Sequence, residues 1–210
     1  IEYRLNKAHV KAVIVDYSVS ARIDEAAPAC ADLQLKIQVG DESLPDGWVD
    51  YASMLAEASA DFPKPPNPEE FACGADPLLI FFSSGTTGMP KMVQHNHYYP
   101  RGHVLTGVYW HNLEPGDMHL TVADTGWGKA VWGKSYGQWM AGAAVFVYDF
   151  RGKFEPATLL RVVAEHGVTT FCAPPTVYRF LVREDLSQYD LSGLRHCTTA
   201  GELLNESVFH

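Results

Sequence analysis

Residues 78–91 read LLIFFSSGTTGMPK, an apolar run followed by a loop of glycine and hydroxyl-bearing residues. The apolar residues at 78–82 predict a buried strand, and the small polar residues after them predict a turn at the edge of a sheet. Gly85 and Gly88 allow the backbone to adopt positive φ, so that amide hydrogens can turn toward an anion. This stretch therefore predicts a strand that leads into an anion-binding loop.

The same loop supplies hydrogen-bond donors and a positive charge. Its hydroxyl groups come from Ser83, Ser84, Thr86 and Thr87. Pro90 stiffens the exit, and Lys91 offsets the charge of phosphate oxygens. Only two residues separate Gly85 from Gly88 and no third glycine opens a helix, which excludes a Walker loop and a dinucleotide fingerprint. The pattern favours a phosphate-binding loop, and a Ser/Thr-rich surface turn is the alternative.

The overall composition limits the classes of function. The chain has 210 residues, of which 47% are hydrophobic, so it can bury a substantial core. The formal net charge of −9 argues against nucleic acid or an anionic membrane as a partner, because both require a positive field. The longest apolar run, 139–148, is too short to cross a bilayer.

The cysteines and histidines bear on compartment and metal binding. Four cysteines lie far apart in the sequence, which favours buried free thiols in a reducing compartment. No signal peptide is visible, so we expect a cytoplasmic protein. His95, His97 and His103 have no carboxylate or cysteine at a ligand-like spacing, and we predict no metal site in the chain.

Apolar runs alternate with helical patterns along the chain. We predict strands at residues 12–15, 33–39, 78–82, 119–123, 143–148, 168–172 and 194–199. We predict helices at residues 48–58, 98–110, 130–141, 156–166 and 176–183. This alternation predicts an α/β fold of mostly parallel β-sheets flanked by helices. Ligands bind outside the carboxyl ends of such strands, so we expect the loops after 78–82, 119–123 and 194–199 to line one crevice.

Four prolines between residues 62 and 68 mark a change in organisation. They exclude a regular element there and predict a semi-rigid connector. We therefore divide the chain into a first αβ portion at 1–62, a proline-rich connector at 63–75 and a second αβ portion at 76–210.

Several of these segments resemble motifs of one enzyme family. Ser83–Lys91 closely resembles the phosphate-binding signature of the AMP-forming acyl-CoA synthetases, a branch of the adenylate-forming enzymes. Ala123–Trp127 resembles the family's aromatic motif near the acyl pocket, and Ala200–Glu202 resembles the segment along the adenine. Ala173–Arg179 resembles the stretch that precedes it. Met92, together with the aromatic motif, makes the chain most similar to the acetyl- and medium-chain acyl-CoA synthetases.

This resemblance implies part of a large N-terminal domain whose 76–210 portion binds ATP and the acyl group. It implies that a short- or medium-chain carboxylic acid reacts with ATP, in the presence of Mg²⁺, to give an acyl-adenylate, from which CoA then displaces AMP. Lys91 and Thr86 are expected to act on the reacting phosphates. The nucleotide is expected to bind Ser83, Ser84, Gly85, Thr86, Thr87, Gly88, Met89, Pro90, Lys91, Gly201, Glu202 and Leu203.

The acid is expected to bind Trp127, Gly128 and Lys129. A core aromatic residue is the alternative for Trp127, and a solvated residue at a helix start is the alternative for Lys129. Glu202 either contacts the nucleotide or acts as a carboxylate that favours a helix start.

The chain also departs from the family's pattern. The Tyr-Gly-x-Thr-Glu motif, a ribose-binding aspartate and a small C-terminal domain are absent, and the sequence opens at Ile1. We therefore expect an incomplete piece that does not catalyse the full reaction alone, and robust carboxylate-dependent pyrophosphate exchange by it would contradict this. A domain that loads a carrier protein and a non-catalytic nucleotide-binding module stay open as alternatives. The sequence does not predict an oligomeric state.

Overall fold

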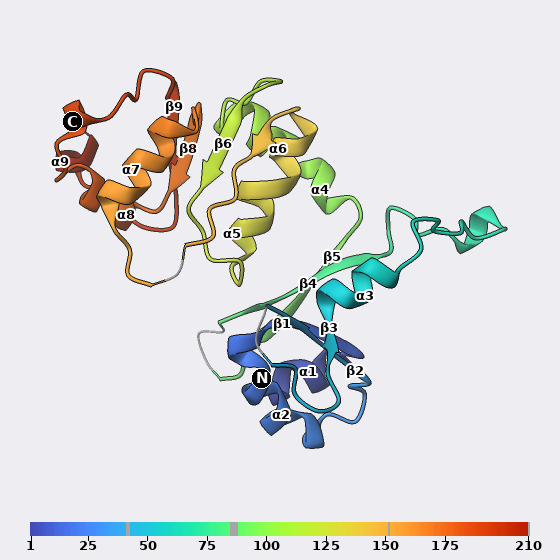
Figure 1. Ribbon diagram of the computed structural model, residues 1–210. Helices are drawn as coiled ribbons and strands as arrows, with labels where there is room; N and C mark the ends of the chain where they lie inside the picture. The colour runs from blue at the N-terminus through green and yellow to red at the C-terminus, as the bar shows by residue number, and fades with distance from the viewer. Residues whose placement is uncertain (41–42, 85–87, 151, 210) are drawn as a thin grey trace. The chain divides into compact units, whose positions relative to one another are not determined.

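The computed structural model describes residues 1–40, 43–84, 88–150 and 152–209. The chain divides into two compact units, Ile1–Asn96 and His97–His210 (Figure 1). The predicted division, with a connector at 63–75, differs from this one because the strands after the connector group with the N-terminal unit. The assignment of ligand-binding roles to the predicted portions stays a prediction.

The N-terminal unit begins with a small parallel sheet. Its strands are β1 (Ala12–Asp16), β2 (Leu35–Val39) and β3 (Val49–Asp50), in the order β1-β2-β3. The helices around it are α1 (Glu2–Lys7), α2 (Ser20–Ala26) and α3 (Tyr51–Glu57). Val13, Ile23 and Trp48 form the buried core, so the apolar residues of β1 and α2 meet beneath the sheet.

Two elements of this unit differ from expectation. Helix α2 was not predicted. The helix predicted at 48–58 begins at residue 51, because Val49 and Asp50 pair with β2 and the Asp50 carboxylate accepts a hydrogen bond from Ser53 N at 2.7 Å. An aspartate in this position caps a helix start, which fixes where the strand ends and the helix begins.

The strand of the predicted phosphate loop does not belong to a parallel sheet. It forms β4 (Pro77–Ser83), which pairs antiparallel with β5 (Lys91–Asn96) in a separate two-stranded sheet. The connection between them spans only residues 84–90, whereas a parallel pairing needs a crossover of about a dozen residues or more. This strand therefore does not share a sheet with those near 119–123 and 194–199, and the expectation that the three loops line one crevice stays a prediction.

The C-terminal unit contains the main parallel sheet. Its strands are β6 (Met118–Thr121), β7 (Ala144–Val145), β8 (Thr170–Ala173) and β9 (His196–Thr199), in the order β7-β6-β8-β9 with every pair parallel. The helices are α4 (Tyr99–Gly102), α5 (Gly128–Val131), α6 (Gly137–Met140), α7 (Pro156–Glu165), α8 (Pro175–Leu181) and α9 (Glu206–Phe209). The predicted α/β class is confirmed, although the strand predicted at 143–148 is reduced to the short edge strand β7.

The helices predicted at 98–110 and 130–141 are each interrupted. A π-helical turn, Thr106–Trp110, follows α4, and another, Trp132–Tyr136, joins α5 to α6. The two backbones approach closely here, because a Cβ placed on Gly107 would lie 2.5 Å from the Gly137 carbonyl oxygen. Only glycine tolerates that distance, and the contact depends on residues that are far apart in the sequence.

The two faces of this sheet differ in chemistry. Leu120 and Phe171 point toward α7 and α8 and form the apolar core with Leu159, Leu160 and Val163. The alternate residues of the same strands, including His119 and Thr170, are also buried but are polar. Figure 1 shows α7 and α8 on one side of β6 and β8, and α5 and α6 on the other. Because side chains along a strand point alternately to the two faces of a sheet, one face of this sheet is apolar and the other is polar although buried.

Asp117 ties the amino ends of the four strands together. Its carboxylate pairs with Arg195, just before β9, and accepts hydrogen bonds from Thr169 Oγ1 at 2.8 Å and Glu114 N at 2.7 Å. Its carbonyl oxygen accepts a hydrogen bond from Ala144 N of β7 at 2.7 Å. Burial acts to raise the pKa of the Asp117 carboxyl, but the hydrogen bonds from Arg195, Glu114 and Thr169 outweigh it and lower that pKa.

The cysteines are free thiols. Cys30 and Cys172 are buried as predicted, whereas Cys73 and Cys197 are exposed. None of the helices in the described part of the chain combines the length and hydrophobicity that a bilayer-spanning segment requires.

The apolar face can be tested by truncation. Leu120 is 1% exposed, so Leu120→Ala should lower the free energy of unfolding by about 2–5 kcal/mol through lost burial and the resulting cavity. Leu105 is 65% exposed, and Leu105→Ala should change the free energy of unfolding by roughly 0.5 kcal/mol or less. Urea unfolding followed by circular dichroism measures both, and equal effects of the two changes would contradict the assignment of the core.

Candidate functional site

The topology of the C-terminal sheet indicates where a ligand binds. The chain leaves β6 toward β7 on one side and leaves β8 toward β9 on the other. Adjacent parallel strands whose connections diverge in this way open a crevice outside their carboxyl ends. The carboxyl ends of β6 and β8 lead into the loop at 122–127 and into Pro174, so these segments border the candidate site.

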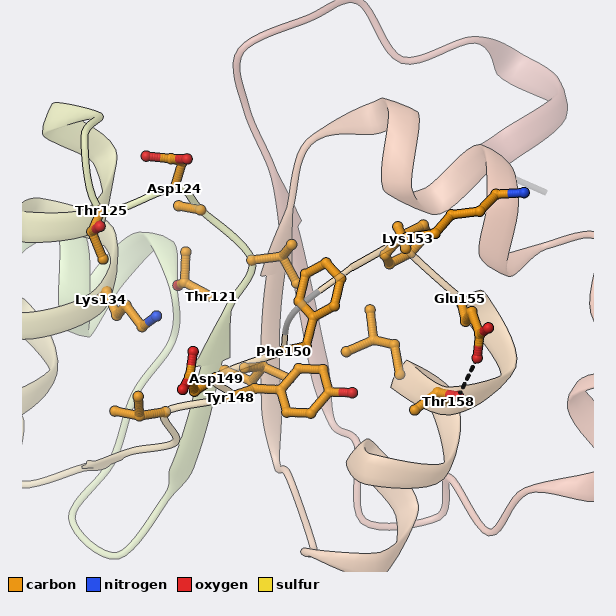
Figure 2. Close-up of a pocket in the computed structure, with 16 residues that line it drawn as sticks. Thr121, Asp124, Thr125, Lys134, Tyr148, Asp149, Phe150, Lys153, Glu155 and Thr158 are labelled. Atoms are coloured by element: carbon orange, nitrogen blue, oxygen red, sulfur yellow. Dashed lines mark hydrogen bonds between the residues drawn. The ribbon is translucent and has the colours of Figure 1, made fainter. Parts of the chain in front are cut away.

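A cavity of about 790 Å³ lies at this edge of the sheet, next to the end of β6. It is lined by the loop at 122–125, by residues 147–150 and 153–155, and by the first turn of α7 (Figure 2). Its lining includes three residues of the predicted aromatic motif, namely Ala123, Asp124 and Thr125. The cavity therefore borders a segment that sequence reasoning had associated with the acid.

Half of the residues that line the cavity are apolar or aromatic, and the other half are polar or charged. Tyr148 and Phe150 stack with their ring centroids 5.8 Å apart. Lys134 extends toward Thr121 and Asp149 in Figure 2, so a positive charge enters the cavity from the π-helical turn. Such a lining combines apolar surface with polar and charged groups, which suits a small organic ligand that carries polar groups of its own.

The residues predicted to bind the acid lie beside this cavity but do not line it. Trp127 is 58% exposed, so the alternative of a core aromatic is wrong. Gly128 is the first residue of α5. The Lys129 ammonium is buried, so the alternative of a solvated lysine is also wrong. None of the three is among the residues that line the cavity.

The predicted adenine segment follows β9 and is held against α8. Thr176 Oγ1 donates to the Glu202 carboxylate at 2.6 Å, and Arg179 Nη1 lies 3.4 Å from it. Arg179 Nη2 donates to the carbonyl of Leu203 at 3.0 Å. Helix α9 begins only at Glu206, so Glu202 is not a helix-start carboxylate. The position of the segment is therefore fixed before any ligand binds.

The predicted phosphate loop belongs to the N-terminal unit. Ser83 and Lys91 face each other as the last paired positions of β4 and β5, so the loop is closed at its base. Gly88 has φ of 95°, as predicted. The other central residues, Gly85, Thr86 and Thr87, lie outside the described residues.

Helix α1 contributes to this loop, which the sequence did not indicate. Tyr3 Oη donates to the carbonyl of Pro90 at 3.2 Å, and the Tyr3 ring meets Phe82 edge-on at 6.4 Å. The Arg4 guanidinium lies 5.8 Å from the Phe82 ring centroid. These contacts join segments separated by 87 positions, so no local pattern could have predicted them.

A buried network covers the polar face of the C-terminal sheet, and sequence reasoning missed it as well. His119 Nδ1 lies 2.7 Å from Thr170 Oγ1, and its Nε2 lies 2.7 Å from Thr121 Oγ1. The Gly133 carbonyl accepts hydrogen bonds from Thr121 Oγ1 and from Gln138 Nε2, the latter at 2.6 Å. The π-helical turn at 132–136 thus presents a backbone oxygen to the sheet.

Two imidazoles in this network stay neutral at ordinary pH. Burial, with smaller contributions from His119, Lys129 and His196, lowers the pKa of His111 from 6.5 to about 3. Burial also lowers the pKa of His119 to about 4, against opposing contributions from the Gly133 carbonyl and Asp117.

Comparison with known proteins identifies the family. A family model described as AMP-binding enzyme matches residues 1–210. The chain belongs to this family. The membership that the motifs predicted is thereby confirmed.

Relatives of this AMP-binding enzyme include the human proteins named acyl-coenzyme A synthetase ACSM5, mitochondrial, and ACSM4, mitochondrial. They are 38% and 37% identical to it, in both cases over 99% of the chain. The chain spans 35% of the length of these relatives.

Solved structures agree on the fold. The anthranilate CoA ligase AuaEII in complex with anthranoyl-AMP is similar with a TM-score of 0.86 and 24% identity, over 99% of this chain and 39% of that one. An acyl-CoA synthetase of Brucella canis is similar with a TM-score of 0.81 and 23% identity, over 99% of this chain and 36% of that one. These two similarities show the fold alone.

The family resemblance implies Mg²⁺. Within the described ranges, no three histidine, cysteine or carboxylate side chains gather as metal ligands. Because Mg²⁺ is commonly held by one or two carboxylates and by substrate phosphates, a dedicated cage is not required. The described residues do not form a Mg²⁺ site of their own.

The buried imidazoles predict a pH dependence of stability. Both pKa values lie below 6.5 in the folded chain, so the unfolded chain binds more protons between about pH 4 and 6.5. The free energy of unfolding should therefore fall as the pH is lowered from 7 to 5. Urea unfolding at both pH values measures this, and His119→Asn should show a smaller fall. His9→Asn is the matched control, because His9 is a surface histidine with an 81% exposed side chain. Equal stability of the unaltered protein at the two pH values would contradict the assignment.

Proposed function

We propose that this AMP-binding enzyme is an AMP-forming acid–thiol ligase. It activates a short- or medium-chain carboxylic acid with ATP to give an acyl-adenylate and transfers the acyl group to CoA. The observation that carries the proposal is the family match over residues 1–210, combined with a parallel sheet whose divergent carboxyl edge borders the aromatic motif. The names of the human relatives support the same activity.

The first step brings a carboxylate to the α-phosphorus of ATP. Both reactants are anions, so the protein must offset charge and hold the attacking oxygen in line with the leaving pyrophosphate. We assign this task to the loop Ser83–Lys91, with Lys91 and Thr86 as the catalytic residues. Its closed base and the positive φ of Gly88 support this role, because they preorganise donors before the nucleotide arrives.

The remaining roles are assigned to the C-terminal unit. We assign the adenine to Gly201, Glu202 and Leu203, whose position is fixed by Thr176 and Arg179. Leu203 is 87% exposed, which suits a residue that a planar ring will cover. We assign the acid to Trp127, Gly128 and Lys129. The neighbouring cavity, which combines aromatic and aliphatic side chains with two lysines, supports an organic ligand with a charged group over an inorganic ion.

We propose a cytoplasmic location on the basis of the free thiols. The human relatives carry the word mitochondrial in their names, which describes those proteins. Fluorescence microscopy of the tagged complete gene product distinguishes the two compartments.

The activity is tested by carboxylate-dependent exchange of labelled pyrophosphate into ATP, using the complete gene product. Addition of CoA should then release AMP, whereas a carrier protein in its place should not. Failure of every short- and medium-chain acid to support exchange would contradict the proposal.

The phosphate-binding role is tested by Lys91→Ala. Loss of one preorganised charged donor should lower the exchange rate by about 100-fold, corresponding to about 3 kcal/mol of transition-state stabilisation. Lys64→Ala is the matched control, because Lys64 is exposed in the proline-rich segment and should leave the rate unchanged. An unchanged rate and unchanged ATP affinity in Lys91→Ala would contradict the assignment.

A further inference from the structure

Helix α8 connects the apolar core to the segment that we assign to the adenine. Val177 and Leu181 of α8 are buried in the core of the C-terminal sheet. Tyr178 Oη donates to the carbonyl of Thr198 in β9 at 3.0 Å, and the Tyr178 ring meets Phe171 edge-on at 5.6 Å. The helix is therefore fixed both to the apolar core and to the last strand of the sheet.

The segment that follows β9 has little structure of its own. Residues 200–205, all of which the structure describes, lie between β9 and α9 and belong to no helix or strand. Gly201 has φ of 102°, and no described atom lies within 4 Å of a Cβ placed on it. Such a segment adopts many conformations unless side chains from elsewhere hold it, and ordering it on binding lowers the affinity for a ligand.

Two side chains of α8 hold this segment. Thr176 Oγ1 donates to the Glu202 carboxylate and lies 2.9 and 2.6 Å from its two oxygens. Arg179 donates from Nη1 to the same carboxylate at 3.4 Å and from Nη2 to the Leu203 carbonyl at 3.0 Å. Residues three positions apart share one face of a helix, so both side chains reach the segment together. The forked guanidinium of Arg179 joins two consecutive residues of the segment.

These contacts act on the segment more than on the stability of the whole fold. The side chains of Arg179 and Glu202 are 36% and 42% exposed, and partly exposed ion pairs contribute little to overall stability. Both acceptors belong to the segment, so loss of the contacts releases it without uncovering the core. Because α8 engages the Glu202 carboxylate, the backbone at 201–203 and the open side of Gly201 are left for a planar base.

We propose that Thr176 and Arg179 are positioning residues for the nucleotide, which hold residues 201–203 in the conformation that receives adenine without contacting the base themselves. This inference rests on the proposed function, which assigns the adenine to that segment. The same proposed function assigns the phosphates to the loop Ser83–Lys91 and the acid to Trp127–Lys129, in other parts of the chain. Only a ligand that carries the base therefore gains from the held segment.

The proposal is tested in pyrophosphate exchange by the complete gene product, with separate KM values for ATP, the acid and pyrophosphate. Arg179→Met should raise the KM for ATP by roughly 10-fold, because the segment must then be ordered when the nucleotide binds. The KM values for the acid and pyrophosphate, and kcat, should change by no more than about twofold, because neither of these two substrates carries a base. Arg179→Lys keeps the charge but loses the fork, so its KM for ATP should lie between those of Arg179→Met and the unaltered protein.

A matched control and a second variant complete the experiment. Arg183 comes just after the same helix, and its guanidinium lies 5.8 Å from the Phe180 ring, so Arg183→Met should leave all three KM values unchanged. Thr176→Val removes the hydroxyl that Glu202 accepts from and should also raise the KM for ATP. This variant decides the outcome if Arg179→Met does not fold.

An unchanged KM for ATP in Thr176→Val, or in a folded Arg179→Met, would overturn the proposal. An equal rise in all three KM values would overturn it too, because that result indicates a general loss of structure. No exchange with any acid by the unaltered protein would instead overturn the proposed function, and this inference with it.

Discussion

The Asp117 carboxylate is the constraint on which the C-terminal unit depends. The carboxylate pairs with Arg195 at the start of β9 and accepts a hydrogen bond from Thr169 at the start of β8. Asp117 itself precedes β6, and its backbone carbonyl accepts a hydrogen bond from Ala144 of β7. With the amino ends fixed at one point, the strands run in register and their carboxyl ends meet at one edge. The loop at 122–127 and the segment at 200–203 both start from that edge. The same carboxylate that stabilises the sheet thus determines where ligand-binding loops can lie.

The local signals in the sequence were sufficient to predict where most helices and strands of the C-terminal unit lie. Pro156 and Gly167 bracket α7, and the strands β6, β8 and β9 lie within a few residues of their predicted positions. The failures have tertiary causes. The helices predicted at 98–110 and 130–141 are interrupted where Gly107 and Gly137 approach each other closely. The sequence pattern of one helix alone does not indicate a contact with the other. The antiparallel pairing of β4 was missed because an apolar run predicts a strand but not the direction of its partner. The predicted burial of this strand is also wrong, since none of its residues is buried and Ile80 is 41% exposed.

The candidate site shows the same division between local and tertiary information. The phosphate loop and the aromatic motif were visible because each is one continuous segment. The polar face was invisible because His111, His119 and Gln138 come from separate segments, and a single histidine in sequence indicates a surface residue more often than a buried one. The buried ammonium of Lys129 is likewise a tertiary result, since a lysine at a helix start is ordinarily solvated. The structure therefore adds chemistry behind α5 that the motif alone did not indicate.

The central claim is that ligands bind at the carboxyl edge of the β7-β6-β8-β9 sheet. The most direct measurement is amide hydrogen exchange of the complete gene product with and without a hydrolysis-resistant acyl-adenylate analogue, an acyl sulfamoyl adenosine. The account predicts slower exchange in residues 122–129 and 199–203 on binding, with residues 113–117 and 192–195 at the amino edge unchanged. Binding without protection at the carboxyl edge, or with protection confined to the amino edge, would contradict it.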